Sequence, residues 1–260
     1  CQGFSTLRTK RRNVAEFDPR NELVFEILRL TRSIRPQSII FENVPGFTLD
    51  QRFRKFCEEL SKCGYSTKHA VLDATNYGVP QRRRRLVLLC LRNSRPIPHN
   101  WSFPLKSEIK TVRDSISHLP SAGKSGDLLH DFPEQRSPNV MERIKAIPKD
   151  GGSRKDIPPE LALRCHLETD GYTDVYGRMA WDKVSPTITS GCTNPSKGRF
   201  LHPNENRAIT LREAALLQTF PQKYKFDLSR GKGNVSRQIG NAFPPKLIEP
   251  IARRLYRELI

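Results

Sequence analysis

The feature that most constrains the fold is an alternation of helical and extended segments in the first third of the chain. Residues 21–34 and 50–63 repeat apolar side chains at helical spacing. Between and after them, residues 38–41, 65–72 and 86–91 form short apolar runs typical of strands. Helices and strands that alternate over short connections predict an α/β fold, in which helices pack against a sheet.

The spacing also predicts where helices begin and end and which side chains face the core. Asn21 is a candidate N-cap for the first helix, Pro36 ends it, and Gly64 ends the second. Thr210 and Glu213 have capping-box spacing at the start of a later helix. The side chains expected to face inward are Leu23, Ile27, Leu30 and Ile34, then Phe53, Phe56, Cys57 and Leu60, and, in a last helix from about Pro245, Leu247, Ile251, Leu255 and Leu259.

The sequence changes in character near residue 95. Beyond that point Pro and Gly become frequent and helical periodicity is short, which predicts an irregular module of small strands and loops. The helical pattern returns after residue 200. We therefore predict three segments: an α/β part over 1–95, the irregular module over 96–200, and a return to the α/β part with a C-terminal helix over 201–260.

Positive charge is abundant and unevenly distributed. The chain has 45 Lys and Arg against 27 Asp and Glu, a net charge of +18. Residues 1–100 carry 19 basic and 9 acidic groups, 101–200 carry 15 and 13, and 201–260 carry 11 and 5. This distribution favours a polyanion that contacts the two ends of the chain. The alternative is a basic surface that serves only solubility.

The sequence argues against several classes of protein. No apolar run approaches the roughly 18 residues that a membrane span needs, and no signal peptide is visible. The 6 cysteines show no CxxC spacing, so we expect reduced thiols, without a disulfide scaffold or a metal site. These features are typical of a cytoplasmic protein.

Five short blocks carry residues suited to chemistry, and their order is more specific than any one of them. They are Cys1-Gln2-Gly3-Phe4-Ser5, Phe41-Glu42-Asn43-Val44, Gln81-Arg82-Arg83-Arg84-Arg85, Arg207 to Glu213 with Leu217 to Pro221, and Gln238-Ile239-Gly240-Asn241-Ala242-Phe243-Pro244-Pro245. The series resembles the cytosine-C5 DNA methyltransferase family, in which Pro-Cys-Gln, Glu-Asn-Val, Gln-x-Arg-x-Arg, Arg-x-x-Thr-x-Arg-Glu and Gly-Asn-x-x-Pro-Pro blocks follow this order. The resemblance covers essentially the whole chain. It implies the C-terminal part of a Rossmann-like methyltransferase sheet, with residues 96–200 as a small target-recognition domain.

Taken singly, these residues have simpler explanations. Cys1 could be the nucleophile of an N-terminal-nucleophile hydrolase, and Glu42 could be a solvated charge at the end of a strand. Asn241 could be a turn residue, and the run Arg82–Arg85 a solvated or phosphate-binding stripe. It is the series of blocks that favours the family.

The arginine run has one informative property. Side chains alternate between the two faces of a strand. Gln81, Arg83 and Arg85 therefore share one face, while Arg82 and Arg84 point away. This spacing is that of the Gln-x-Arg-x-Arg block.

The resemblance implies a covalent mechanism. A cysteine thiolate adds to C6 of cytosine and makes C5 nucleophilic toward the methyl group of S-adenosylmethionine. The family assigns this thiolate to Cys1. It assigns Glu42 to the ring nitrogen N3, where a carboxylic acid can donate a proton, and Arg85 to the O2 oxygen. Arg83 is expected to brace the adjacent site or to bind a phosphate.

The resemblance also implies duplex DNA as the partner, with the target base flipped out of the stack. The basic segment after Cys1 is where the family closes on DNA, and the near-neutral module is expected to read bases in the major groove. The expected DNA-contacting residues are Gln2, Ser5, Arg8, Lys10, Arg11, Arg12 and Gln81. We expect a protein of bacterial restriction-modification or orphan type, in the cytoplasm and associated with the nucleoid.

One family block is absent from the sequence. Family members carry a Phe-x-Gly-x-Gly block and an acidic residue that bind S-adenosylmethionine, and only Leu23 and Asn241 can be assigned to the cofactor here. The family sheet has seven strands, of which this chain supplies about three, so residues 39–42 are expected at an unpaired apolar edge. We therefore expect an upstream methyltransferase fragment or subunit as a second partner.

Two other functions stay open. One is a relative that methylates cytosine in tRNA, although the sizeable module over 96–200 favours DNA, because recognition of a DNA sequence needs such a module. The other, from a different class, is a catalytically silent DNA-binding subunit.

Overall fold

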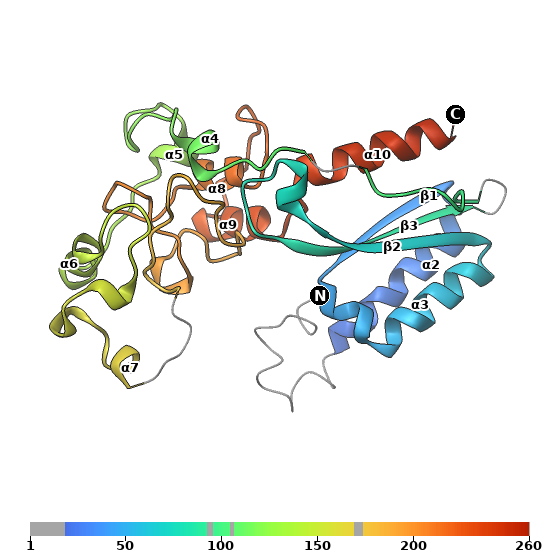
Figure 1. Ribbon diagram of the computed structural model, residues 1–260, viewed down its shortest axis with the longest axis horizontal. Coiled ribbons are helices and arrows are strands. Elements are labelled where there is room, and N and C mark those ends of the chain that lie inside the picture. The colour runs from blue at the N-terminus through green and yellow to red at the C-terminus, as the bar shows by residue number, and fades with distance from the viewer. Residues whose placement is uncertain (1–18, 93–95, 105–106, 169–173, 260) are drawn as a thin grey trace. The chain divides into compact units, whose positions relative to one another are not determined.

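The computed structural model describes residues 19–92, 96–104, 107–168 and 174–259 (Figure 1). The chain divides into two compact units. Unit 1 comprises Cys1–Asp73, Arg84–Lys106 and Glu249–Ile260, and unit 2 comprises Ala74–Arg83 and Ser107–Ile248. These boundaries differ from the predicted segments, because residues 201–248 cluster with the irregular module and only 249–260 cluster with the first part of the chain.

Unit 1 is built on a three-stranded antiparallel sheet. Its strands are β1 (Ser38–Asn43), β2 (Tyr65–Asp73) and β3 (Arg84–Arg92), in the order β1-β3-β2. Both β1 and β2 pair with β3, so the most apolar strand occupies the centre, and Val87, Leu88 and Leu89 are fully buried there. The α/β fold class expected from the sequence is confirmed, and β1 lies at an edge of this sheet as expected.

Two helices cover one face of the sheet. They are α2 (Val24–Ile34) and α3 (Gln51–Lys62), which bury their apolar faces against Leu86, Leu88 and Cys90 of β3 (Figure 1). In the same figure the last helix, α10 (Pro245–Leu259), lies on the other side of the sheet. Its predicted inward residues Leu247, Ile251 and Leu255 are buried.

The predicted orientation of α2 is correct only for Ile27, which is partly buried and packs against the core of unit 1. Its buried side chains are Val24, Leu28 and Thr31, whereas the expected core residues Leu23, Leu30 and Ile34 are exposed. Two apolar series run along this helix, and the choice between them depends on the partner sheet. Thr31 tolerates burial because its hydroxyl donates a hydrogen bond to the Ile27 carbonyl 2.7 Å away.

The predicted start of the first helix is also wrong. A 3₁₀ helix (Pro19–Leu23) precedes α2, so Asn21 lies within a helical turn and Leu23 occupies the N-cap position. The end is close to the expected one: Arg35 takes a left-handed conformation, φ 48°, and Pro36 follows.

The prediction for α3 is confirmed. Asp50 caps the helix by accepting a hydrogen bond from the Arg52 amide, and Phe53, Phe56 and Leu60 are buried. Gly64 follows at φ 83°, a conformation that favours glycine at a helix end.

Unit 2 consists of short helices joined by long irregular segments, as the sequence predicts for much of it. Its helices are α4 (Val112–Ile116), α5 (Leu128–Asp131), α6 (Pro138–Ala146), α7 (Arg164–Leu167), α8 (Leu211–Leu217) and α9 (Lys232–Asn241). Short 3₁₀ helices occur in both units, over Pro45–Leu49, Ala74–Tyr77, Arg154–Asp156, Pro159–Leu161 and Pro195–Lys197. The main core of unit 2 joins α4, α8 and α9 through Val112, Leu211 and Ile239.

The start of α8 is held by the predicted capping box. The Thr210 hydroxyl accepts a hydrogen bond from the Glu213 amide, and the Glu213 carboxylate accepts one from the Thr210 amide at 2.7 Å. The helix therefore begins where the sequence indicates.

Candidate active site

Glu42 and Arg85 form an ion pair on one face of the sheet of unit 1. Glu42 of β1 pairs in register with Val87 of β3, and Arg85 lies two residues from Val87 on the same strand. Residues two apart on a strand point to the same face, so Glu42 and Arg85 are diagonal neighbours. The Arg85 Nε atom lies 2.8 Å from the Glu42 Oε1 atom.

The pair is shielded but still reachable. The Arg85 side chain is 15% exposed and that of Glu42 is 30% exposed. Burial lowers the pKa of Arg85, and the charge and hydrogen bond of Glu42 oppose that shift. An arginine remains charged in this setting. The site therefore presents a carboxyl group and a fixed cation side by side, which is an arrangement suited to a polar ring that gains charge during a reaction.

The predicted alternation of the arginine run is confirmed. Gln81 and Arg83 are buried, Arg85 is half-buried, and Arg82 and Arg84 are exposed. Gln81 and Arg83 differ from Arg85 in their surroundings, however. The strand β3 begins only at Arg84, and Gln81 and Arg83 belong to unit 2.

Arg83 is used inside unit 2. Its Nη1 atom donates a hydrogen bond to the Ile188 carbonyl at 3.0 Å, and Nη2 donates to the carbonyls of Gly240 and Ala242 at 3.1 and 3.0 Å. With its side chain 2% exposed, this guanidinium has no free approach for a base or a phosphate. Arg83 therefore connects the segments that contain Ile188 and Gly240 through hydrogen bonds.

Gln81 is held in the same way, and its expected role as a DNA contact stays a prediction. It is fully buried, its Oε1 atom accepts a hydrogen bond from the Ile188 amide at 2.9 Å, and its Nε2 atom donates to the Leu217 carbonyl and to Gln218. Gln218 in turn donates to the carbonyls of Ile239 and Ala242, both at 2.8 Å. The network thus ties the Gln-x-Arg block to segments more than a hundred residues away.

Gly240 is required where α9 meets the segment around Thr189. A Cβ atom on Gly240 would lie 2.2 Å from the Thr189 carbonyl carbon and 2.3 Å from the Ser190 nitrogen, both main-chain atoms. Any side chain would therefore force the two segments apart. The next residue, Asn241, ends α9 with an exposed side chain.

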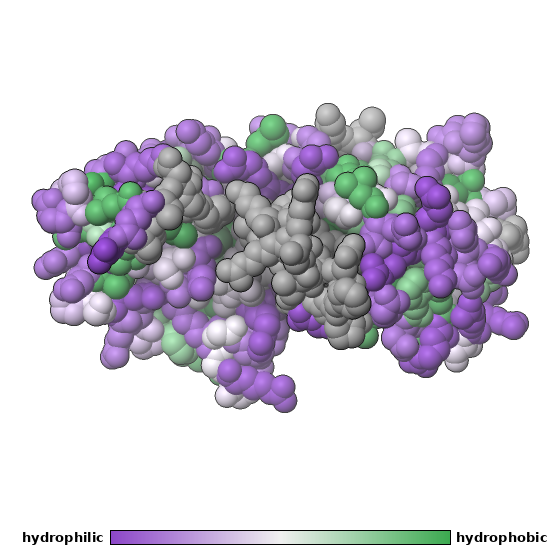
Figure 2. All heavy atoms as spheres, turned by 90° about the horizontal axis from the view of Figure 1, so that it is seen from below, coloured by the Kyte–Doolittle hydropathy of each residue, from purple (hydrophilic) through white to green (hydrophobic). Residues whose placement is uncertain are grey.

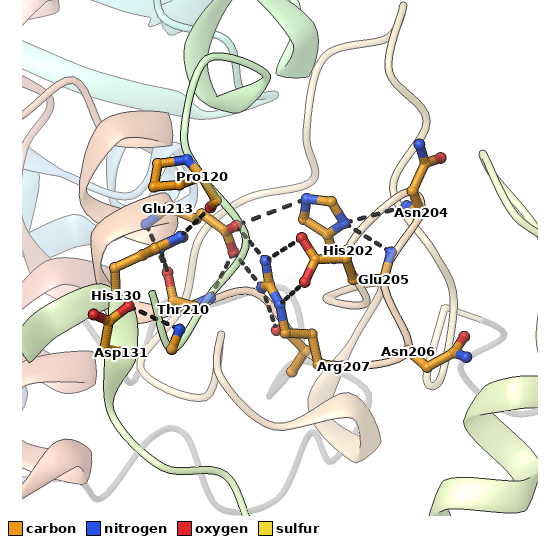
Figure 3. Close-up of polar contacts among 12 residues, drawn as sticks. Pro120, His130, Asp131, His202, Asn204, Glu205, Asn206, Arg207, Thr210 and Glu213 are labelled. Carbon is orange, nitrogen blue, oxygen red and sulfur yellow. Dashed lines mark hydrogen bonds and ion pairs between the residues drawn. The ribbon is translucent and has the colours of Figure 1, made fainter. Parts of the chain in front are cut away.

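A second buried polar network surrounds α8 (Figure 3). The Arg207 guanidinium donates to both carboxylate oxygens of Glu213 at 2.7 Å and also pairs with Glu205. Burial opposes the charged form of Arg207, but these carboxylates outweigh it and raise its pKa. Burial likewise opposes ionisation of Glu213, and Arg207 outweighs it, so the pKa of Glu213 is lowered. The pair fixes the Arg-x-x-Thr-x-Arg-Glu block as a rigid support.

His202 completes this network as a neutral ring. Its Nδ1 atom accepts hydrogen bonds from the amides of Asn204 and Glu205 at 3.2 and 3.0 Å (Figure 3). An atom that accepts two hydrogen bonds carries no proton, so the proton belongs on Nε2, which faces Glu213 at 3.7 Å. Burial lowers the pKa of His202 to about 4.

Several predicted site residues lie outside the described residues. These are Cys1, Gln2, Ser5, Arg8, Lys10, Arg11 and Arg12. The two predicted cofactor residues are both described and accessible, since Leu23 is 61% exposed and Asn241 is also exposed. The roles expected for all of these residues stay predictions.

Neither Gln218 nor Ile188 was predicted to support the Gln-x-Arg block, although both lie at the centre of the network around Gln81. A signal was present for Gln218, because it lies inside the block from Leu217 to Pro221. Ile188 contributes main-chain atoms only, and nothing in a side-chain pattern identifies such a contact.

No helix among the described residues is long and apolar enough to span a membrane. Hydrophilic side chains predominate on the face shown in Figure 2, with hydrophobic ones in small separate groups. Within the same described ranges, no cluster of three or more His, Cys, Asp or Glu side chains is placed to hold a metal ion.

Comparison with known proteins places these observations in a family. The family model for C-5 cytosine-specific DNA methylase matches residues 1–257. The Type II methylase M.HgiDII of Herpetosiphon aurantiacus is 40% identical over 273 residues, covering 100% of this chain and 74% of its own length. The Type II methyltransferase M1.HphI of Haemophilus parahaemolyticus is 32% identical, covering 99% of this chain and 66% of its own length.

The fold is shared with a solved protein encoded within an E. coli prophage and described as a DNA modification methyltransferase. The TM-score is 0.67 at 23% identity, covering 93% of this chain and 75% of that one. An α/β methyltransferase fold thus carries the Glu42 and Arg85 pair. The chain belongs to the C-5 cytosine-specific DNA methylase family.

Proposed function

We propose that this chain transfers a methyl group from S-adenosylmethionine to C5 of a flipped-out cytosine in duplex DNA. The observation that carries the proposal is the Glu42–Arg85 pair, at 2.8 Å. It brings together one residue of the Glu-Asn-Val block and one of the Gln-x-Arg-x-Arg block on one face of the sheet, in a chain whose family is named for cytosine-specific DNA methylation.

In the proposed reaction the thiolate of Cys1 adds to C6 of the cytosine ring and places electron density on C5. Glu42 donates a proton or a strong hydrogen bond to N3, and Arg85 holds O2, so the charge that the ring gains is neutralised on both sides. After C5 has been methylated, its proton is removed and the C6–S bond breaks, which restores the aromatic ring and the free thiolate.

S-Adenosylmethionine supplies the electrophilic methyl group. Leu23 and Asn241 are the side chains proposed to contact it, and their exposure leaves both accessible to a ligand. Leu23 offers an apolar surface for a flat ring, and Asn241 offers an amide that can donate and accept hydrogen bonds.

The structure supports a positioning role for Arg83 in place of the catalytic role expected from the sequence. Its three hydrogen bonds to main-chain carbonyls hold the segment that leads directly into Arg85. Gln81 is proposed to act in the same way, through Ile188 and Gln218. DNA contacts are proposed for the segment with Gln2, Ser5, Arg8, Lys10, Arg11 and Arg12.

We also propose that methyl transfer needs an upstream segment or subunit that carries the glycine-rich cofactor block. The support is the absence of that block from the sequence, together with the 74% and 66% of the two relatives' lengths that the chain spans. Activity should therefore be assayed with the chain alone and with such a segment added.

A trapping experiment tests the covalent step. Fluorine at C5 cannot leave as the proton does, so duplex DNA with 5-fluorocytosine at the target position should form an adduct that survives denaturing electrophoresis when S-adenosylmethionine and the upstream segment are supplied. The adduct should disappear in Cys1→Ser and persist in Cys63→Ser, a control on the partly exposed Cys63. An adduct that persists in Cys1→Ser would reject the assignment of the nucleophile.

A further inference from the structure

A basic groove lies at the end of the sheet opposite to Glu42 and Arg85. Ser38 pairs with Leu91 and Tyr65 pairs with Arg92, so the starts of β1 and β2 meet the end of β3. Arg85 lies near the other end of the same strand, which at 3.3 Å per residue places it about 23 Å from Arg92. The groove has a volume of about 500 Å³.

Four cations from three elements line this groove. They are Arg32 and Arg35 at the end of α2, Lys62 at the end of α3, and Arg92 at the end of β3. Glu59 pairs with two of them, at 2.7 Å from Arg32 and 2.8 Å from Lys62. The groove therefore keeps a local excess of positive charge.

Two of these cations lack any protein partner within the part of the chain that the structure describes. The side chains of Arg35 and Arg92 make neither a hydrogen bond nor an ion pair with a described residue, although their main-chain amides bond to the Thr31 and Gln37 carbonyls. Their guanidinium groups, which are exposed and half-exposed respectively, are free to bind a ligand in the groove.

Helix stabilisation explains only half of this charge. The carbonyl end of a helix attracts basic side chains, which accounts for Arg32 on α2 and Lys62 on α3. Arg35 lies beyond the end of α2 in a left-handed conformation, and Arg92 lies on a strand. Arg92 contributes to no helix end, and Arg35 caps α2 with its main-chain amide and not with its side chain, so the convergence of their two guanidinium groups on one groove needs another explanation.

We propose that this groove binds the phosphate backbone of duplex DNA at a place distinct from the candidate active site. Guanidinium groups bind phosphate oxygens through paired hydrogen bonds, and a cluster of them suits adjacent phosphates. The proposal rests on the proposed function only in naming DNA as the polyanion.

Contacts in this groove are independent of DNA sequence. The other residues that line it offer little that could distinguish bases, because Gly64 has no side chain and the Tyr65 hydroxyl already donates to the Pro36 carbonyl at 2.6 Å. A site that offers cations without base-reading groups holds DNA by its backbone and leaves specificity to other parts of the protein.

The test is the salt dependence of binding to a duplex that lacks any target cytosine. Each phosphate contact contributes about 0.9 to the slope of log affinity against log salt concentration. The double variant Arg35→Gln/Arg92→Gln should flatten this slope by roughly 1 to 2 and weaken binding at low salt by about tenfold or more. Neither side chain is in an ion pair with a described residue, so both changes should leave the fold in place.

A matched control removes the same charge elsewhere in unit 1. Arg29 and Arg253 are exposed and pair with Glu26 and Glu249 on their own helices, so Arg29→Gln/Arg253→Gln should leave the slope close to that of the unmodified chain. Equal slopes for the groove variant and this control would overturn the proposal. A second result would also overturn the proposal. If millimolar inorganic phosphate occupied the groove while the groove variant left the salt slope for the duplex unchanged, the groove would be a site for small anions.

The outcome is separable from that of the proposed function. Glu42→Gln should lose methyl transfer and keep the full salt slope, because Glu42 lies at the far end of the sheet. If the unmodified chain methylates no DNA even with the upstream segment added, but the groove variant still flattens the slope, the groove stands and the proposed enzymatic activity fails.

Discussion

Glu42 is the residue on which the proposed chemistry depends most directly. The change Glu42→Gln keeps the size of the side chain and a hydrogen bond to Arg85 but removes the acidic proton. We expect the turnover number to fall by about 10² to 10⁴, the usual contribution of a positioned acid or base. Methyl transfer to duplex DNA, measured with radiolabelled S-adenosylmethionine and the upstream segment added, checks this.

The matched control is Glu249→Gln. Glu249 is also a surface carboxylate paired with an arginine, here Arg253 at 2.8 Å on α10. Its removal should leave turnover unchanged. Turnover of Glu42→Gln within a factor of two of the unmodified protein would remove Glu42 from the mechanism.

His202 makes stability dependent on pH. A free histidine has a pKa near 6.5, whereas burial lowers that of His202 to about 4. Below about pH 6.5 the unfolded chain binds a proton at this position that the folded chain does not accept, so the stability contributed by His202 is lost as the pH falls from 6.5 toward 4.

The change His202→Gln retains an acceptor for the two amides but does not titrate. The unfolding free energy of this variant should fall less than that of the unmodified protein between pH 6.5 and 5. The difference corresponds to at most one proton, or about 1.4 kcal/mol per pH unit. Chemical denaturation at several pH values measures it, with the exposed His118→Gln as control. An unchanged pH slope for His202→Gln would show that another group controls this loss.

At the scale of the elements, α9 offers a direct comparison of two glycines. Gly240→Ala places a methyl group 2.2 to 2.5 Å from main-chain atoms of Thr189 and Ser190 and displaces the Gly240 carbonyl that Arg83 binds. We expect a loss of unfolding free energy of roughly 1 to 3 kcal/mol, together with reduced methyl transfer because Arg83 positions the strand of Arg85.

Gly233 on the same helix is the control. A Cβ atom there would meet nothing within 4 Å, so Gly233→Ala should stabilise the protein by about 0.5 to 1 kcal/mol through the helical preference of alanine. Thermal denaturation of the two variants compares them. Equal stability of both would contradict the close packing at Gly240.

A helix could be predicted well where residues close in the sequence fix its ends and its buried face. The helix α3 has an N-cap at Asp50, a single apolar face and Gly64 at its end, and all three are visible in the sequence. In α2 two apolar series compete, and only contact with the sheet selects Leu28 over Leu30. Long-range packing therefore decided the case in which the prediction was wrong.

The same distinction applies to the candidate site. Strand alternation and the order of the blocks were sufficient to predict that Glu42 and Arg85 belong to one site, and they are paired. The partners of Arg83 are main-chain carbonyls of segments about 105 to 159 residues away, and no side-chain pattern reveals them. The hydrogen bonds of Arg83 within the chain could for this reason not be predicted.

Buried arginines bind main-chain carbonyls at more than one place in unit 2. Arg178 is fully buried and donates to the carbonyls of Ile144, Ile147 and His202, much as Arg83 does elsewhere. Irregular backbone leaves carbonyls without a helical or strand partner, and a buried carbonyl needs one. A guanidinium with its five donors can satisfy several at once. Part of the positive charge of this unit therefore stabilises loops and is not available to DNA.

At the scale of the whole molecule, the two edges of the sheet differ in their readiness to pair with another chain. Within the part of the chain that the structure describes, β1 and β2 each pair on one side only, with β3. The β2 edge carries Thr67, Lys68 and His69, and a charged edge resists pairing. The β1 edge carries Ile39, Ile40 and Phe41 in succession.

We therefore expect the 260-residue chain to self-associate through β1 at micromolar concentration. A lysine on this edge should oppose that pairing, because a second strand would bury its charge. The change Ile40→Lys should shift the mass measured by light scattering toward the monomer, while Thr67→Lys on β2 should not. Ile40 is only partly buried, so its replacement leaves the apolar contacts of Phe41 with Phe47 and Phe56 in place. An unmodified chain that stays monomeric at every concentration would show that β1 is protected by a part of the protein other than this sheet.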